Sequence, residues 1–148
     1  MPLTNLFKNS LYYWGFAAAV AWPLVHPAFT APGKAQVAVG AALWLASQAA
    51  NFAVHAQLAG MRGAEGSDDR RPPGGPLFAL VTSPNYTAEV LGWVGWTAVT
   101  ALTGAAVFTA VGFAQMAQWA RAKHAGYKKT DAGRAYAKAR AAIVPFLL

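Results

Sequence analysis

Four long apolar segments dominate this chain, and its charged residues fall almost entirely between these segments or after the last of them. The segments cover about residues 11–29, 35–60, 86–102 and 104–120. About 20 apolar residues in a helix cross the roughly 30 Å hydrocarbon core of a bilayer. Only 11% of the residues are charged, whereas a soluble domain carries about 25%. The pattern predicts one domain, residues 1–148, with an all-α fold: a polytopic membrane helical bundle of about four apolar helices with a basic cytoplasmic tail.

The distribution of positive charge predicts orientation and excludes several functions. The net charge is +7, and most Lys and Arg residues lie in the loop 62–71 and the tail 121–140. Both segments should therefore face the cytoplasm. A nucleic-acid-binding protein would need a basic stripe on a soluble face, so the expected partner is membrane lipid and not nucleic acid. The chain has no cysteine and its histidines are isolated, so neither a disulfide nor a metal site is expected.

The N-terminal region carries two further signals. Pro23 and Pro27 predict that the first helix kinks or ends early, near Trp22. The opening MPLTNLFKNS has a single lysine, and no clear cleavage site follows it, so a cleavable signal peptide is not expected. Met1 is then either an internal start or the cut end of a longer protein.

A polar stripe runs along the second segment. Ser47, Asn51 and His55 recur every four residues, and Arg62 follows seven residues later, so the four share one helix face. Hydrogen bonds between membrane helices explain such a stripe, and this reading is preferred for Ser47. For Asn51 and His55, ligand binding is an equal alternative, because their stripe ends in an arginine.

Ionisable and polar residues also open the third segment. Pro84 marks a helix boundary, and Asn85 is a candidate N-cap. Glu89 lies in an otherwise apolar stretch. There it either interacts favourably with the helix dipole, pairs with a basic tail residue, or belongs to a functional site. Tyr86 suits a belt of interfacial aromatic residues, but it is contiguous with Asn85 and Glu89.

The tail is basic, with tyrosines interleaved: Arg121, Lys123, His124, Tyr127, Lys128 and Lys129. Anionic lipid headgroups and nucleotide phosphates both suit this chemistry. Neither a GxGxxG motif after a strand nor a GxxxxGK[ST] motif occurs, which excludes Rossmann and P-loop nucleotide sites. A dinucleotide would have to lie among membrane helices and cytoplasmic loops.

Several of these motifs together resemble a known family. PNYTAEVLGWVGW at 84–96, KHAGY at 123–127 and RAAIVPF at 140–146 look like the C-terminal domain of the steroid 5α-reductase family. The similarity is closer to its very-long-chain trans-2-enoyl-CoA reductase branch, with which NFAVH at 51–55 and the N-terminal segment also agree. The resemblance covers essentially the whole chain in register.

The resemblance implies a multi-pass enzyme of the endoplasmic reticulum membrane. Such enzymes use NADPH to reduce the 2,3 double bond of a long- or very-long-chain trans-2-enoyl-CoA in fatty-acid elongation, alongside other elongation enzymes. It implies that Tyr86 is the catalytic proton donor. It also implies cofactor contacts at Asn51, Arg62, Asn85, Glu89, His124, Tyr127 and Arg140.

The chain also departs from the family pattern. Ser83 stands where this branch often has cysteine, and the tail around Tyr136 is longer than usual, which weakens the assignment of Arg140. The family carries a ubiquitin-like domain and further membrane helices upstream, so the chain corresponds to a C-terminal half that could be inactive alone. Two alternatives stay open: a steroid or polyprenol enone reductase of the same family, and a non-catalytic membrane fragment or scaffold.

Overall fold

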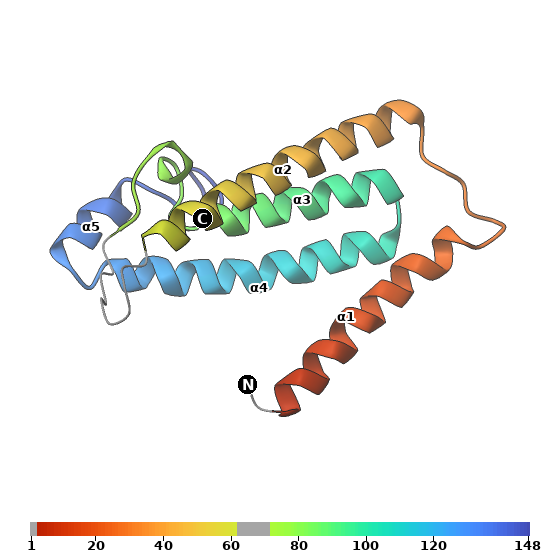
Figure 1. Cartoon of the computed structure of the whole chain (residues 1–148), viewed down its shortest axis with the longest axis horizontal. Coiled ribbons are helices and arrows are strands. Elements are labelled where there is room, and N and C mark those ends of the chain that lie inside the picture. The colour runs from red at the N-terminus through yellow and green to blue at the C-terminus, as the bar shows by residue number, and fades with distance from the viewer. Residues whose placement is uncertain (1–2, 62–71) are drawn as a thin grey trace.

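The computed structural model describes residues 3–61 and 72–148, and this part of the chain is helical (Figure 1). Its elements are α1 (Leu3–Leu24), α2 (Lys34–Gly60), the 3-10 turn η1 (Pro76–Phe78), α3 (Pro84–Thr100), α4 (Thr103–Tyr127) and α5 (Asp131–Lys138). Only an isolated bridge between Val81 and Ala141 has β character in the described residues. The predicted all-α class is confirmed.

The helix boundaries differ from the predictions in ways the residues explain. α1 begins eight residues earlier than expected and ends at Leu24, directly after Pro23, because proline removes a backbone donor. α4 continues to Tyr127, so the first part of the predicted tail is helical. This stretch begins with Arg, Ala and Lys, which are strong helix formers.

The antiparallel helices α2 and α3 are packed with their backbones in close approach (Figure 1). A Cβ atom on Gly40 would lie 2.8 Å from the Gly95 carbonyl oxygen, and one on Gly95 would lie 2.8 Å from the Trp44 nitrogen. Such small residues let membrane helices approach closely. The contact fixes the register of the two helices, and with it the side chains that face each other further along.

Helices α3 and α4 form a hairpin whose turn lies slightly before the predicted break. Ala101 adopts the left-handed conformation, with φ 53°, and its N–H donates to the Thr97 carbonyl at 2.8 Å. The two arms are joined by a hydrogen bond between the Thr97 and Thr109 hydroxyls at 2.9 Å. Gly104, which was expected at the break, lies inside α4, where it allows α1 to approach: a Cβ there would meet the Ala19 oxygen at 3.1 Å.

The segment before α3 and the segment after α5 are held together by backbone hydrogen bonds. The N–H groups of Thr82 and Ser83 donate to the carbonyls of Ala141 and Ala142, at 2.9 and 3.1 Å. The Thr87 hydroxyl adds a bond to the Ile143 carbonyl at 2.6 Å. These bonds hold the C-terminal segment against the start of α3.

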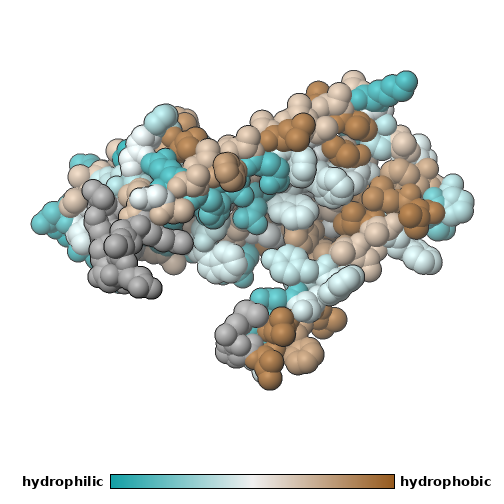
Figure 2. Space-filling view, in the orientation of Figure 1, coloured by the Kyte–Doolittle hydropathy of each residue, from teal (hydrophilic) through white to brown (hydrophobic). Residues whose placement is uncertain are grey.

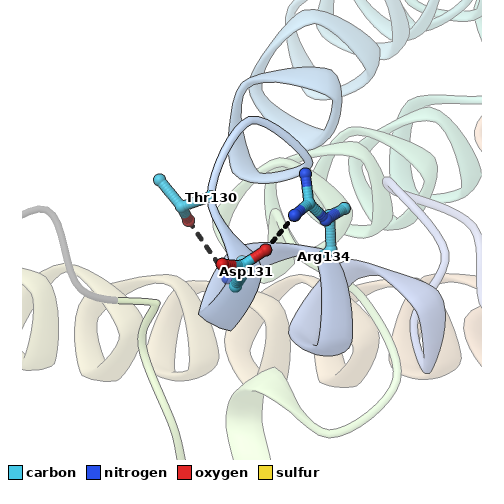
Figure 3. Close-up of polar contacts among 4 residues, drawn as sticks. Thr130, Asp131 and Arg134 are labelled. Atoms are coloured by element: carbon cyan, nitrogen blue, oxygen red, sulfur yellow. Dashed lines mark hydrogen bonds and ion pairs between the residues drawn. The ribbon is translucent and has the colours of Figure 1, made fainter.

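Helix α5 was not predicted, although its N-terminal signal is in the sequence. Thr130 is its N-cap and accepts a hydrogen bond from the Gly133 N–H at 3.1 Å. Asp131 in the first turn pairs with Arg134 (Figure 3). A threonine cap and an acidic first turn are both favourable at a helix start.

Many large apolar side chains are exposed. Phe7, Trp14, Val39 and Phe52 are each 70% or more exposed, and several apolar patches lie on the half of the molecule away from α5 (Figure 2). Within residues 3–61 and 72–148, α2 is the helix with both the length and the apolar character of a membrane span. The prediction of four spans therefore stays a prediction.

Candidate functional site

Four polar side chains lie on one side of the α2–α3 pair, and we call them the polar face: Asn51, His55, Asn85 and Glu89. In α2 and in α3 the two members are four residues apart and so share a helix face. The register follows from Gly92, where a Cβ would meet Gln48 Nε2 at 3.3 Å. Because the helices are antiparallel, the next turns of α2 lie beside the preceding turns of α3. Figure 2 shows hydrophilic side chains between α2 and α4 towards the α5 end.

Buried polar atoms without partners gather in this region. Asn85 is 7% exposed, and Ser83 is fully buried. Among the described residues, Asn51 Oδ1, Asn85 Oδ1 and Ser83 Oγ have no hydrogen-bond partner. A buried unsatisfied polar group costs about 1–3 kcal/mol, so each such atom in a folded protein calls for an explanation. All three can accept a hydrogen bond, which a ligand rich in N–H and O–H donors would supply.

The expected capping role of Asn85 is wrong. The N-cap of α3 is Ser83, and Pro84 occupies the first helical turn, where its missing N–H costs nothing. The N–H groups of Tyr86 and Thr87 donate to the Ser83 carbonyl at 3.1 and 3.2 Å. Asn85 is therefore inside the helix, and its side chain is not used to cap it.

Tyr86 borders the polar face on the side of α3 that faces α4. Its ring packs against the buried cluster that joins α4 to the C-terminal segment, which includes Met116, Ala120 and Ile143. The centroid of the Trp119 ring lies 6.1 Å from that of Tyr86. The phenol is half-buried and held by packing, so its orientation is fixed by three segments of the chain.

His124 is tied to the segment that precedes α3. Its Nδ1 lies 3.3 Å from the Thr82 hydroxyl, which also lies 3.4 Å from the Ala142 carbonyl oxygen. If the hydroxyl donates to that carbonyl, it accepts from Nδ1–H, and Nε2 is left as an acceptor. Burial, with a contribution from Lys128, lowers the pKa of His124. The imidazole is therefore neutral at physiological pH.

Tyr127, Tyr136 and Arg140 form a stacked group beside α5. The two tyrosine rings lie 5.1 Å apart, and the guanidinium carbon of Arg140 lies 4.2 Å above the Tyr136 ring. Arg140 also donates from Nε to the Phe78 carbonyl at 2.5 Å and from Nη1 to the Tyr136 carbonyl at 2.9 Å. Burial raises the pKa of Tyr136 to about 12. Arg140 thus has a structural role, because Nε and Nη1 bind backbone carbonyls. Its Nη2 group remains to donate to a ligand.

A groove of about 460 Å³ lies between the end of α4, α5 and the C-terminal segment. Its lining includes the cationic side chains of Arg121, Lys138 and Arg140, which suit phosphate oxygens, and the neutral imidazole of His124. Lys138 was missed because α5 was missed. Arg62, which was also expected at the cofactor site, lies outside the described residues.

The predicted site residues therefore fall into two neighbouring groups at one end of the molecule. Asn51, Asn85 and Glu89 lie on the polar face, with Tyr86 at its border. His124, Tyr127 and Arg140 lie at the end of α4 and beside α5, and the Thr82–Asn85 segment connects them to the first group through the Thr82–His124 contact. The fold thus brings together polar acceptors, a phenol and cationic groups.

Comparisons with known proteins agree over the full chain. The 3-oxo-5-alpha-steroid 4-dehydrogenase family matches residues 1–148. The chain is 42% identical to a very-long-chain enoyl-CoA reductase of Dictyostelium discoideum and 46% identical to a probable very-long-chain enoyl-CoA reductase of Caenorhabditis elegans. It is 36% identical to a trans-2,3-enoyl-CoA reductase-like protein of Mus musculus. These alignments cover 99–100% of the chain but 49%, 50% and 42% of the three relatives, so the chain spans about half their length.

Proposed function

Because the chain belongs to the 3-oxo-5-alpha-steroid 4-dehydrogenase family, we propose that it is the catalytic membrane half of an NADPH-dependent enoyl-CoA reductase. The reaction would reduce the 2,3 double bond of a long- or very-long-chain trans-2-enoyl-CoA and give the saturated acyl-CoA. The relatives named as enoyl-CoA reductases support this substrate class over a steroid. The observation that carries the proposal is the position of Tyr86, a half-buried phenol beside a face of unsatisfied acceptors.

The residues present fit a nicotinamide dinucleotide. Asn51, Asn85 and Ser83 offer buried acceptor atoms without partners, which suit the N–H donors of a carboxamide and the hydroxyls of a ribose. Glu89 adds a carboxylate acceptor on the same face. The cationic side chains of Arg121, Lys138 and Arg140, in the groove that His124 also lines, would hold the phosphates.

NADPH supplies the hydride for C3 when bound. The role of Tyr86 would then be to deliver its hydroxyl proton to C2, so that the two hydrogens added to the double bond come from different donors. The Tyr86 phenol is a group of the kind that acts as a general acid in enzymes. Its contacts with Trp119 and the α4 cluster would hold the hydroxyl in one orientation, which positioned proton transfer requires.

The membrane arrangement follows from charge. We propose that α1, α2, α3 and α4 all cross the endoplasmic reticulum membrane and that the α5 end faces the cytoplasm. The basic residues of this end support the orientation. It would place the phosphate groove in water and the exposed aromatic residues of α1 in lipid. Other fatty-acid elongation enzymes would then be neighbours in the same membrane.

The test is NADPH oxidation by the detergent-purified chain, with and without a long-chain trans-2-enoyl-CoA. Tyr86→Phe keeps the ring and removes only the hydroxyl, so turnover should fall by about 10²-fold or more while NADPH binding, followed by fluorescence, is retained. Tyr12→Phe is the matched control, because Tyr12 is also half-buried among aromatic rings but lies on α1. Full turnover by Tyr86→Phe would rule out the proton-donor role.

Substrate competition tests the reaction itself. A steroid enone and a polyprenol enone serve as alternative substrates. Reduction of either one, with none of the enoyl-CoA, would replace the proposed substrate class. NADPH binding without turnover of any enone would mean that residues outside this chain are required for catalysis.

A further inference from the structure

A second cavity, of about 470 Å³, lies between α1, α3 and α4, in the half of the molecule away from α5. Its walls include Phe16, Ala17 and Ala21 of α1, Trp93 and Trp96 of α3, and Phe108 of α4. The ring centroids of Trp93 and Phe108 are 4.4 Å apart, and those of Phe16 and Phe108 are 4.9 Å apart. The volume falls within the roughly 300–1,000 Å³ typical of ligand pockets, and the wall is almost entirely hydrocarbon.

The cavity continues the polar face along α3. Asn85, Glu89 and Trp93 recur every four residues, and Trp96 follows three residues later, so all four share one side of the helix. That side changes from polar in the first half of α3 to aromatic in the second. Trp93 is seven residues from Tyr86, which is about 10 Å along the helix axis.

We propose that this cavity holds the hydrocarbon chain of the substrate beyond its reactive double bond and sets the longest chain that is reduced efficiently. The inference rests on the proposed reductase activity. The thioester end would lie at the polar face beside Tyr86, and the methyl end would lie deeper, towards Ala21 and Trp96. The wall offers almost no hydrogen-bonding group to a polar ligand, whereas the methylene groups of an acyl chain are stabilised when they leave water for it.

The occupant follows from the order of the two regions. A trans-2-enoyl-CoA is polar at the thioester and apolar along the rest of the acyl chain, which matches the order in which α3 presents Asn85 and Glu89 and then Trp93 and Trp96. Because the cavity begins about two turns of helix beyond Tyr86, a short acyl chain would not reach it. Only long chains should respond to changes in its volume.

Ala17→Phe tests this length dependence. Ala17 lines the cavity and is exposed, so a larger side chain fills free space without overpacking a buried core. The rate constant kcat/KM for trans-2-hexadecenoyl-CoA should fall about tenfold or more, while that for trans-2-butenoyl-CoA should change less than twofold. Ala18→Phe is the matched control, because Ala18 is exposed on the same turn but does not line the cavity, and both rates should be kept.

Photolabelling supplies a readout that does not depend on turnover. A long-chain trans-2-enoyl-CoA with a diazirine at its methyl end should label residues 16–24 of α1, and Ala17→Phe should reduce this labelling. Labelling of Leu77 and Leu80 instead, in the groove between α2, α3 and η1, or of no site, would overturn the proposal. So would equal loss of short- and long-chain activity in Ala17→Phe. A wild-type chain that reduces neither substrate would show that this chain alone is not an active reductase, and labelling alone would then decide whether the acyl chain binds in this cavity.

Discussion

The close backbone approach between α2 and α3 predicts how strongly these two helices depend on each other. We consider Gly95→Ala, which adds a single methyl group on the face of α3 that meets α2. That methyl carbon would lie 2.7 Å from the Gly40 carbonyl oxygen and 2.8 Å from the Trp44 nitrogen. Both atoms belong to the α2 backbone and cannot rotate away. The two helices would have to separate for the variant to fold.

The expected cost follows from two opposing effects. Overpacking a well-packed interface costs about 1–3 kcal/mol, and a clash with backbone belongs in the upper half of this range. Alanine in place of glycine in a helix interior gains about 0.8–1 kcal/mol. The free energy of unfolding should therefore fall by about 1–2 kcal/mol.

The measurement is a reversible SDS titration of the chain in mixed micelles, followed by circular dichroism. Two glycine variants serve as controls. At Gly92, an added Cβ meets Gln48 Nε2 at 3.3 Å, which is the movable end of a side chain, so Gly92→Ala should cost nothing. At Gly15, nothing lies within 4 Å, so Gly15→Ala should gain only the propensity term. The reasoning is refuted if Gly95→Ala is as stable as the wild type, or if Gly92→Ala is destabilised equally.

Two further predictions concern the α5 end. Arg140→Lys keeps the charge but loses the planar donors to Phe78 and Tyr136, so it should destabilise this end by about 1–3 kcal/mol; hydrogen exchange of α5 measures the effect, and Arg134→Lys, at an exposed ion pair, is the control. The pKa of His124 is lowered in the folded state, so the folded chain binds fewer protons than the unfolded one. The stability from this group is present above about pH 6.5 and is lost as the pH falls through the folded pKa. His124→Gln should flatten the dependence of unfolding free energy on pH between 8 and 5, and an unchanged slope would contradict this assignment.

Hydrophobic runs predicted the four long helices because burial in lipid or protein imposes length and composition on each. They could not predict the boundaries equally well. The start of α1 at Leu3 lies in a stretch rich in Thr, Asn and Ser, which are weak helix formers. The turn at Ala101 requires a left-handed residue, which sequence preference would assign to glycine. Gly104, the better candidate for a turn, is needed inside α4 so that α1 can approach.

Only part of the candidate site could be predicted from the sequence, because the rest depends on how separate helices pack. The four-residue spacing of Asn51 and His55, and of Asn85 and Glu89, is a local pattern and gave each helix face directly. That the two faces meet depends on the register that Gly40 and Gly95 set between α2 and α3, which no local pattern contains. Arg140 donates a hydrogen bond to a carbonyl of η1, and the position of η1 depends on the tertiary fold. The structural role of Arg140 could therefore not be predicted from the sequence.

Helix α3 is packed or hydrogen-bonded on three sides, which explains how the candidate site can hold its geometry. One side meets the α2 backbone at Gly95, another meets α4 through Tyr86, and Thr87 bonds to the C-terminal segment. A helix fixed on these sides leaves little freedom for the residues between them, which are Asn85 and Glu89. Functional groups on rigid elements hold their geometry better than groups on loops. A change that only separates α2 from α3, such as Gly95→Ala, should therefore impair ligand binding at Asn85 without touching any group that binds the ligand.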